Sequence, residues 1–573
     1  MTYRSIGIVV ALVSTVSAAP DLILHNAKVI TVDDRFSIAQ AIAIEDGRIA
    51  IVGSNDDVLK LMGADTKTID QKGKTVMPGL MDSHTHPSGA SMYEFDHPVP
   101  TMESIDDVLR YVKRRATVLD DGDWIFVSQV FITRLKERRY PSRDELDRAA
   151  PKNPVMFRTG PDASLNSLAL KLSSIDKDFK GDGGPGHVET DSKTGEPSGI
   201  LRGCTRYAKY RAPKSGKSAA EQDRYHRLLS LFRDYSSVGI TAIADRAAGS
   251  SSVKRYKRML DNGELPVRVM SSRSIGTGGN PKAIQHSITK VAEDPLCKGD
   301  DMVRIVGVKI FLDGGMLTGS ARMRVPWGLS RIYSIDDPKY KGVFRTAPEK
   351  LAPIITTAVE NNLQFTAHSV GDGAVHALID AYIEVGKKHN IRKTRPCITH
   401  SNFMSKEAVE KMAKHGIVAD IQPAWLWLDT RTLSKQFDND RLRWFQPLNS
   451  IFKSGAIAGG GSDHMQKIGS LRAVNPYNPW LGMWITITRT PRDYKGQLHP
   501  EEALTRRQAI RFYTSNNAHI LFLEHATGSI EKGKAADIIV IDRDVLNCPV
   551  DDIRNTKVLQ TYLNGKLVFE RKV

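Results

Sequence analysis

The sequence predicts an α/β protein in which a long βα barrel is flanked by two β-rich ends. Three observations lead to this prediction. Apolar segments alternate with helical stretches through most of the 573 residues, as in parallel strands joined by helices. Strand-like runs separated by turn residues occupy both ends of the chain. Polar or glycine residues follow the apolar segments of the middle, where a barrel places its active site.

The first nineteen residues differ in composition from the rest. Arg4 is the one charged residue before an apolar run at 6–16, and small residues precede Pro20. This order is typical of a secretory signal peptide. A buried first strand is the alternative, and the run is shorter than the ~20 apolar residues of a membrane span. We predict a signal peptide at 1–19 and an exported protein, periplasmic or extracellular.

Both ends of the mature chain consist of short strand-like apolar runs separated by turn residues. Asp46-Gly47 separates the apolar runs 41–44 and 48–52, and Asn564-Gly565 separates 558–563 from 566–570. Both dipeptides favour tight hairpin turns. We expect residues 20–76 and 516–573 to form one small domain together.

The middle, residues 77–515, contains eight candidate barrel strands. A long insertion at 88–238 follows the first of them, and we interpret it as a lid and specificity region. The strands are predicted at 76–83, 240–245, 267–271, 305–311, 364–367, 396–399, 417–422 and 456–460.

A pair of histidines ends the first of these strands. Residues 77–87 read Met-Pro-Gly-Leu-Met-Asp-Ser-His-Thr-His-Pro. His84 and His86 are two residues apart, so on a strand both would point to the same face. That spacing suits a shared metal ion. Chance is the alternative, because 16 histidines in 573 residues will sometimes fall two apart.

Three more metal-binding residue types end later strands. His368 follows the fifth candidate strand, His400 the sixth and Asp463 the eighth. Side chains at the carboxyl ends of barrel strands converge, and imidazoles with a carboxylate are ligands that zinc prefers. We therefore predict one or two divalent metal ions, with zinc as the expected element.

The His84 segment resembles the first metal-binding strand of the amidohydrolase superfamily, which reads like PGLIDSHTH. Within that superfamily the chain is similar to the amidohydrolase-3 group, which includes the N-substituted formamide deformylases and related exported hydrolases. Supporting segments are 166–170, 198–202, 263–268 and 528–537. The resemblance implies a metal-dependent hydrolase barrel of the TIM type with a composite β-sandwich built from both termini.

The resemblance also gives Lys309 a role, because it stands where this family carboxylates a lysine to bridge two metals. The residues alone leave two alternatives, a charge partner for Asp313 or a substrate contact. Departures from the group's pattern concern the substrate side rather than the candidate ligands. Thr399 replaces a usual glutamate, His464-Met465 replaces Trp-Pro, and Pro161-Asp162-Ala163 and Gly203 are atypical.

The predicted reaction is hydrolysis of a non-peptide C–N bond in an amide, formamide or cyclic amide by metal-activated water. Asp463 would act as the general base and then as the general acid. A non-hydrolytic lyase or isomerase on the same scaffold is one alternative. A secreted binding or regulatory protein with a vestigial site is the other.

Four tryptophans are candidate substrate contacts. Trp425 and Trp427 follow the seventh strand, and Trp480 and Trp484 follow Asp463. Aromatic side chains there could line an apolar pocket, and packing within the core is the alternative.

Charge and cysteine content exclude other classes of protein. The net charge is +16, but no helix combines basic with aromatic residues in the stripe of a nucleic-acid reader. A solvated cationic surface is the favoured interpretation, and this charge would also favour anionic surfaces or substrates through electrostatic steering. Cys204, Cys297, Cys397 and Cys548 lack zinc-ribbon spacing, and free thiols are favoured over disulfides.

Overall fold

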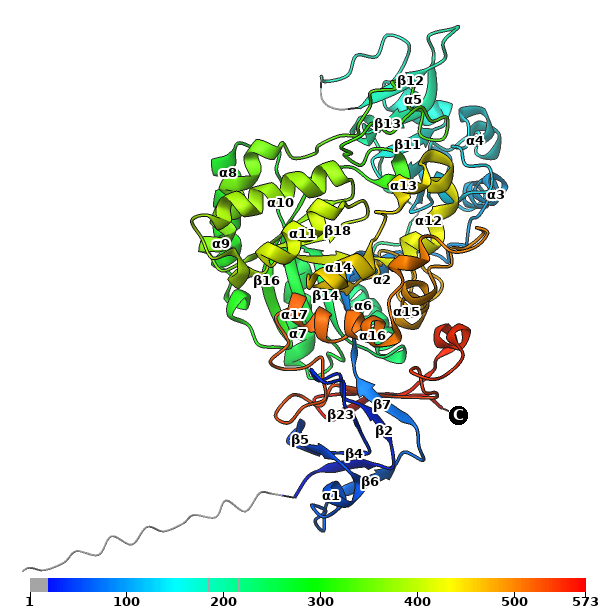
Figure 1. The fold of residues 1–573 in the computed structure, drawn as a ribbon. Coiled ribbons are helices and arrows are strands. Elements are labelled where there is room, and N and C mark those ends of the chain that lie inside the picture. The colour runs from blue at the N-terminus through cyan, green and yellow to red at the C-terminus, as the bar shows by residue number, and fades with distance from the viewer. Residues whose placement is uncertain (1–18, 184–185, 215, 573) are drawn as a thin grey trace, which may run out of the picture.

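The structure is a computed structural model that describes residues 19–183, 186–214 and 216–572. Its centre is an α/β barrel, with a small β-sandwich at one end and the sheet of the long insertion at the other (Figure 1). Nearly all of the predicted signal peptide lies outside the described residues, so that prediction stays open. Within the described ranges no helix is long and apolar enough to cross a membrane.

Eight parallel strands form the barrel, in the sequence order that the apolar segments predict. They are β8 (Leu80–Thr85), β14 (Ile240–Ala248), β15 (Arg268–Ser274), β16 (Val303–Phe311), β17 (Gln364–Ser369), β18 (Cys397–His400), β19 (Val418–Ile421) and β20 (Ala458–Gly460). The α/β barrel prediction is confirmed. Hydrogen bonds close the ring, because the Asp463 amide donates to the His84 carbonyl at 2.8 Å and the Ser462 amide to Asp82 Oδ1 at 3.0 Å.

Helices cover the barrel and bury its largest apolar core between themselves and the strands. The covering helices are α6 (Glu221–Ser237), α7 (Ser250–Asp261), α8 (Pro281–Ala292), α9 (Leu351–Glu360), α10 (Asp372–Gly386), α11 (Lys406–His415), α12 (Pro423–Gln436), α13 (Asn439–Leu442), α14 (Leu448–Ser454), α15 (Pro479–Thr488), α16 (Arg506–Tyr513) and α17 (Ser515–Ile520).

The β-sandwich combines both ends of the chain. One sheet holds β1 (Leu22–His25), β4 (Ala41–Glu45), β5 (Arg48–Gly53) and β6 (Lys67–Asp70), with α1 (Asn55–Leu59) beside it. The other holds β2 (Lys28–Ile30), β3 (Ile38–Ala39), β7 (Thr75–Pro78), β21 (Ile538–Ile541), β22 (Val558–Leu563) and β23 (Lys566–Glu570). Side chains from both ends, including Leu24, Ile42 and Ile538, share one buried core.

Two boundaries differ from the sequence prediction. The predicted strand 76–83 is two strands, because β7 belongs to the sandwich and β8 to the barrel, with Gly79 between them. A Cβ at Gly79 would lie 2.2 Å from Thr241 Oγ1, so the junction requires glycine. At the other end α17 packs against β8 and β20, which places 516–520 with the barrel.

The insertion folds as a mixed five-stranded sheet with short helices. Its strands are β9 (Ile125–Ser128), β10 (Val155–Thr159), β11 (Asp162–Leu165), β12 (His187–Thr190) and β13 (Pro197–Arg202). The helices are α2 (Pro87–Met92), α3 (Ile105–Ala116), α4 (Arg143–Ala149) and α5 (Ser167–Leu172). A capping box between Ser104 and Asp107 begins α3. All four cysteines are free thiols.

Candidate metal centre

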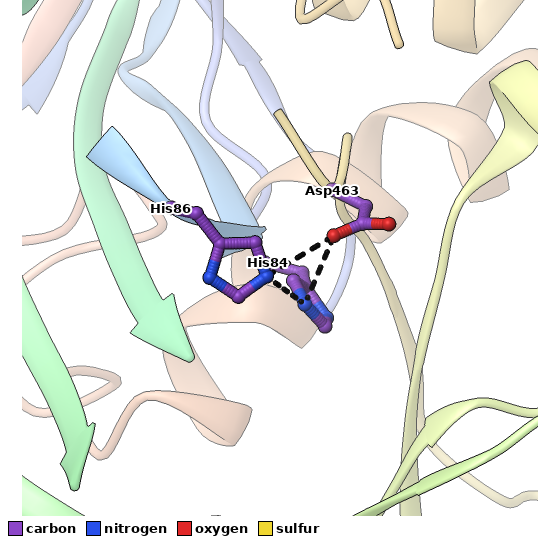
Figure 2. A group of neighbouring side chains, drawn as sticks. All are labelled: His84, His86 and Asp463. Carbon is purple, nitrogen blue, oxygen red and sulfur yellow. Dashed lines mark hydrogen bonds and ion pairs between the residues drawn. The ribbon is translucent and has the colours of Figure 1, made fainter. Parts of the chain in front are cut away.

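Two imidazoles and one carboxylate meet at the carboxyl end of β8. His84 is the fifth residue of β8, and His86 directly precedes α2. Their Nε2 atoms lie 3.2 Å apart, and Asp463 Oδ1 lies 3.4 Å from the first and 3.2 Å from the second (Figure 2). One ligand atom from each residue falls within 4.8 Å of the other two. This donor set suits a divalent metal such as zinc.

Two of the predicted site residues, like other non-glycine residues of the described chain, have positive backbone φ angles. Asp463 has a φ of 53° and His400 a φ of 80°, both in the left-handed region. Side chains other than glycine rarely adopt this conformation without support, and such residues cluster at functional sites. At Asp463 the support comes from the His84 carbonyl, which accepts its amide hydrogen, and from Asn475, whose side chain donates to its carbonyl at 3.0 Å.

His368 and His400 extend the cluster of imidazoles beyond the tight group. The His400 ring stacks on His84 with centroids 4.9 Å apart, and His368 meets the His400 ring edge at 4.5 Å. His400 Nδ1 lies 2.7 Å from Gln422 Oε1, which leaves Nε2 as its free ligand atom. His368 Nε2 lies 3.1 Å from the Gly314 carbonyl, which leaves Nδ1 free.

Burial keeps these imidazoles neutral. Desolvation, helped by the nearby Lys309 charge, lowers the pKa of His84 well below its ordinary value and that of His368 to about 3. Desolvation and the neighbouring imidazoles lower the pKa of His400 in the same direction. Since a metal binds the neutral imidazole, the folded chain presents these side chains in the form that can act as ligands.

Lys309 lies deep in the barrel, on β16, and is 1% exposed. Burial lowers its pKa to about 8. Within the described ranges its Nζ has no hydrogen-bond or ion-pair partner and lies 5.3 Å from the Phe311 ring centroid. Asp313, the alternative partner, instead accepts hydrogen bonds from the amides of Arg322, Val370 and Gly371 at 2.9–3.0 Å.

A buried carboxylate behind the centre was not singled out from the sequence. Asp420, in β19, accepts from His84 Nδ1 at 2.9 Å, and its other oxygen lies 3.3 Å from Arg246 Nε and 3.1 Å from Thr399 Oγ1. The first contact fixes the tautomer that leaves His84 Nε2 free to bind metal. Asp420 lies within the seventh predicted strand, and that position was the only sequence signal for a role in the centre, because the residue is in none of the motifs described above.

The comparisons with known proteins agree with this geometry. The model of the amidohydrolase family matches residues 67–569. This chain belongs to the amidohydrolase family. An N-substituted formamide deformylase from Arthrobacter pascens is 29% identical over 563 residues, which cover 96% of this chain and 98% of that protein. The putative amidohydrolase YtcJ of Bacillus subtilis (strain 168) is 25% identical over 96% of this chain and 99% of its own length.

Solved structures resemble this amidohydrolase along nearly its whole length. An uncharacterised metal-dependent hydrolase from Pyrococcus horikoshii OT3 has a TM-score of 0.66 at 20% identity, covering 92% of this chain and 99% of that one. A similar hydrolase from Pyrococcus furiosus has a TM-score of 0.65 at 21% identity, with 92% and 100% covered. At these identities the likeness shows the fold, and it confirms the predicted barrel.

The four candidate tryptophans of the amidohydrolase are distributed over different environments. Trp425 stacks on His400 at 4.8 Å, beside the metal centre. Trp427 lines a separate cavity of about 360 Å³ and packs under Arg492. Trp480 is fully buried in the core, and Trp484 donates to Asp551 at 2.9 Å in the C-terminal segment. Of the four, the structure brings Trp425 against a candidate ligand.

A cavity of about 520 Å³ lies between the insertion and the barrel loops of this amidohydrolase. Gly314, whose carbonyl faces His368, forms part of its wall. Pro161, Asp162 and Gly203 line it from the insertion, and the Gly203 amide donates to Asp162 at 2.7 Å. Three of the atypical positions of the sequence, Pro161, Asp162 and Gly203, therefore meet in one cavity next to the candidate centre.

Proposed function

We propose that this amidohydrolase hydrolyses a non-peptide C–N bond in an amide-like substrate, with formamides and cyclic amides as the substrates to test first. The observation that carries the proposal is the convergence of His84 Nε2, His86 Nε2 and Asp463 Oδ1 at the carboxyl end of the barrel. The relative named as a formamide deformylase supports the choice of bond.

The donor set fits a divalent metal, which we propose to be zinc. His84 and His86 would hold one ion with Asp463, and His368 and His400 contribute further imidazoles. A carboxylated Lys309 would supply the anionic oxygens that a second ion needs. The environment of Lys309 suits this modification, because only the neutral amine can add carbon dioxide. This amine is buried, and among the described residues it forms no hydrogen bond or ion pair. A metal held there would supply acidified water and a polarised substrate carbonyl.

The chain's own residues would move the proton. The Asp463 side chain is 7% exposed, and its Oδ1 lies 3.2 Å from Nε2 of His86, whose side chain is 27% exposed, so the carboxylate lies beside the most accessible of the three donors. In that position Asp463 can accept a proton from the attacking water and donate it to the leaving nitrogen. Trp425 and the buried floor around Asp420 would exclude bulk water from the opposite side.

The test combines metal analysis with hydrolysis in water enriched in ¹⁸O. Purified protein should contain one or two divalent ions per chain and release an amine from an amide panel. Mass spectrometry should find ¹⁸O in the carboxylic acid product. Turnover without incorporation of ¹⁸O would favour a lyase or isomerase, and a metal-loaded protein with no turnover would favour a binding protein.

A further inference from the structure

Arg345 lines the cavity beside the candidate centre and forms no ion pair with any described carboxylate. The residue is exposed and lines the cavity with its neighbour Phe344. Over the described parts of the chain, its guanidinium has no hydrogen-bond or ion-pair partner, and its contact is with the Phe311 ring at 6.0 Å. An arginine with five unused donors at the edge of a cavity is suited to bind a carboxylate.

The other arginines of the same cavity are already neutralised. Arg202, from β13, pairs with Glu189 at 2.6 Å and Asp162 at 3.3 Å, and its remaining nitrogen donates to Ser334. Arg206 pairs with Asp182 at 2.7 Å. The contact of Arg202 with Ser334 joins the insertion to the loop that carries Ser334, and the other pairs lie within the insertion, so together they build the wall of the cavity. They leave Arg345 as the guanidinium free to receive an external anion.

Acidic residues of the cavity do not fill this role. Asp162 is occupied by Arg202, Tyr140 and the Gly203 amide. Asp336 and Asp337 line the cavity and are exposed, but neither forms an ion pair with Arg345. Desolvation raises the pKa of the buried Asp313 carboxyl to about 7, and the charge of Arg345 offsets part of this rise. Among the described residues, however, no carboxylate forms an ion pair with Arg345, so its guanidinium can still bind an external anion.

An aromatic ring separates Arg345 from the candidate metal ligands. Phe311, at the end of β16, is 37% exposed, and its ring lies 5.5 Å from that of His368. The order from cavity to centre is thus guanidinium, phenyl ring, imidazole. Tyr333, Ile335 and Val343 add apolar surface to the cavity. A complementary substrate would carry its anion one ring's width from the bond to be cleaved, with an apolar segment between them.

We propose that Arg345 determines specificity for amides that bear a carboxylate on an apolar arm, with the carboxylate bound by the Arg345 guanidinium and the arm packed on Phe311. This inference rests on the proposed function and names its substrate class. It agrees with the atypical residues of the same cavity, which set this chain apart on the substrate side. The net charge of +16 would assist the approach of such anions.

The test uses a matched pair of substrates, N-(4-carboxybenzyl)formamide and N-benzylformamide, which differ only in the carboxylate. The wild-type enzyme should prefer the carboxylate compound. Arg345→Met should lower kcat/KM for that compound by about 10- to 100-fold, mainly through KM, because a charged hydrogen bond is lost. Turnover of N-benzylformamide should stay within about twofold. Equal effects on both substrates, or none on either, would overturn the proposal.

A control variant and a binding measurement distinguish failure of the Arg345 anion site from failure of the proposed hydrolase function. Arg331 is an exposed arginine of the same loop that does not line the cavity, so Arg331→Met removes the same charge and should change nothing. Calorimetric binding of 4-methylbenzoate should depend on Arg345 and not on Arg331. Such binding without hydrolysis of any amide of the panel would reject the proposed function and support the anion site. Binding that is equally strong in the wild type and in both variants would reject the anion site.

Discussion

Asp420 Oδ1 and His84 Nδ1 are 2.9 Å apart, and both side chains are fully buried. A carboxylate behind a histidine ligand fixes the orientation of its ring and raises its basicity. The contact joins β19 to β8 across the barrel interior, although the two residues are 336 positions apart. Asp420 therefore acts on the candidate centre through His84 rather than by touching a substrate.

Asp420→Ala should weaken metal binding by about 10- to 100-fold, because His84 loses its hydrogen-bond acceptor. Asp420→Asn keeps an oxygen in place and should lose less. Competition with a chromogenic chelator measures the affinity, and thermal unfolding of the metal-free proteins corrects for the stability lost when Arg246 is left without its anion. An alanine variant with unchanged affinity would remove Asp420 from the support of the centre.

His84→Ala combined with His86→Ala should empty at least one metal position, since two of the three converging donors are lost. Elemental analysis of the purified double variant measures this. His97→Ala is a suitable control because that histidine pairs with Asp96 and Tyr111 in the insertion. Metal content equal to that of the wild type in the double variant would show that the pair does not bind metal.

Lys309→Ala should lose metal and activity, with partial recovery when short carboxylic acids are added. An added acid can occupy the space of the side chain and supply the anionic oxygens of a carbamate. Titration with acetate or propionate, followed by activity and metal content, provides the measurement. Full metal and near-normal turnover in the variant would exclude a bridging role.

Asp463→Asn should retain the fold but lose hydrolysis by about 10²- to 10⁴-fold, as expected for a general acid–base group. Asparagine tolerates the left-handed backbone at this position, so the substitution changes the chemistry more than the structure. Turnover is measured per folded, metal-loaded molecule.

Wild-type turnover in that variant would require another proton carrier, and His464 is not free to take the role. Its Nδ1 lies 2.8 Å from the Tyr235 hydroxyl, and its Nε2 lies 2.7 and 2.8 Å from the carbonyls of Gln466 and Lys467.

The mature protein should begin near Ala19 or Pro20, because small residues follow the apolar run there. N-terminal sequencing of protein from the native source, separated into cellular fractions, measures both cleavage and export. An intact Met1 or Thr2 in the cytoplasmic fraction would contradict the prediction.

Residues at strand ends were predictable from the sequence, and residues defined by packing were not. His84, His368, His400 and Asp463 follow apolar segments, so barrel topology alone predicts that they converge. Asp420 is a lone aspartate within such a segment, and its partner is known only when β19 and β8 are placed in space.

The aromatic residues show the same limit. Trp480 and Trp484 follow Asp463 in the sequence, but they fall on α15, a helix that is buried nearly all round. An apolar helix of this kind has no polar face to indicate which side meets a pocket. The break between β7 and β8 at Gly79 could not be predicted either, because one continuous apolar run contributes a strand to each of two sheets.

The pairing of β21 with β7 means that the sheet containing β7 can be completed only after the C-terminal end of the chain has been synthesised. Ile538 to Ile541 lie antiparallel to Pro78 to Thr75, and the Gly79 amide, at the entry to β8, donates to the Asp537 carbonyl at 2.9 Å. Contacts of such wide sequence separation form late and slowly. A nascent or truncated chain that lacks its last forty residues would expose one edge of β7 to other strands. Tags and fusions at the C-terminus therefore adjoin a segment on which closure of the N-terminal sandwich depends.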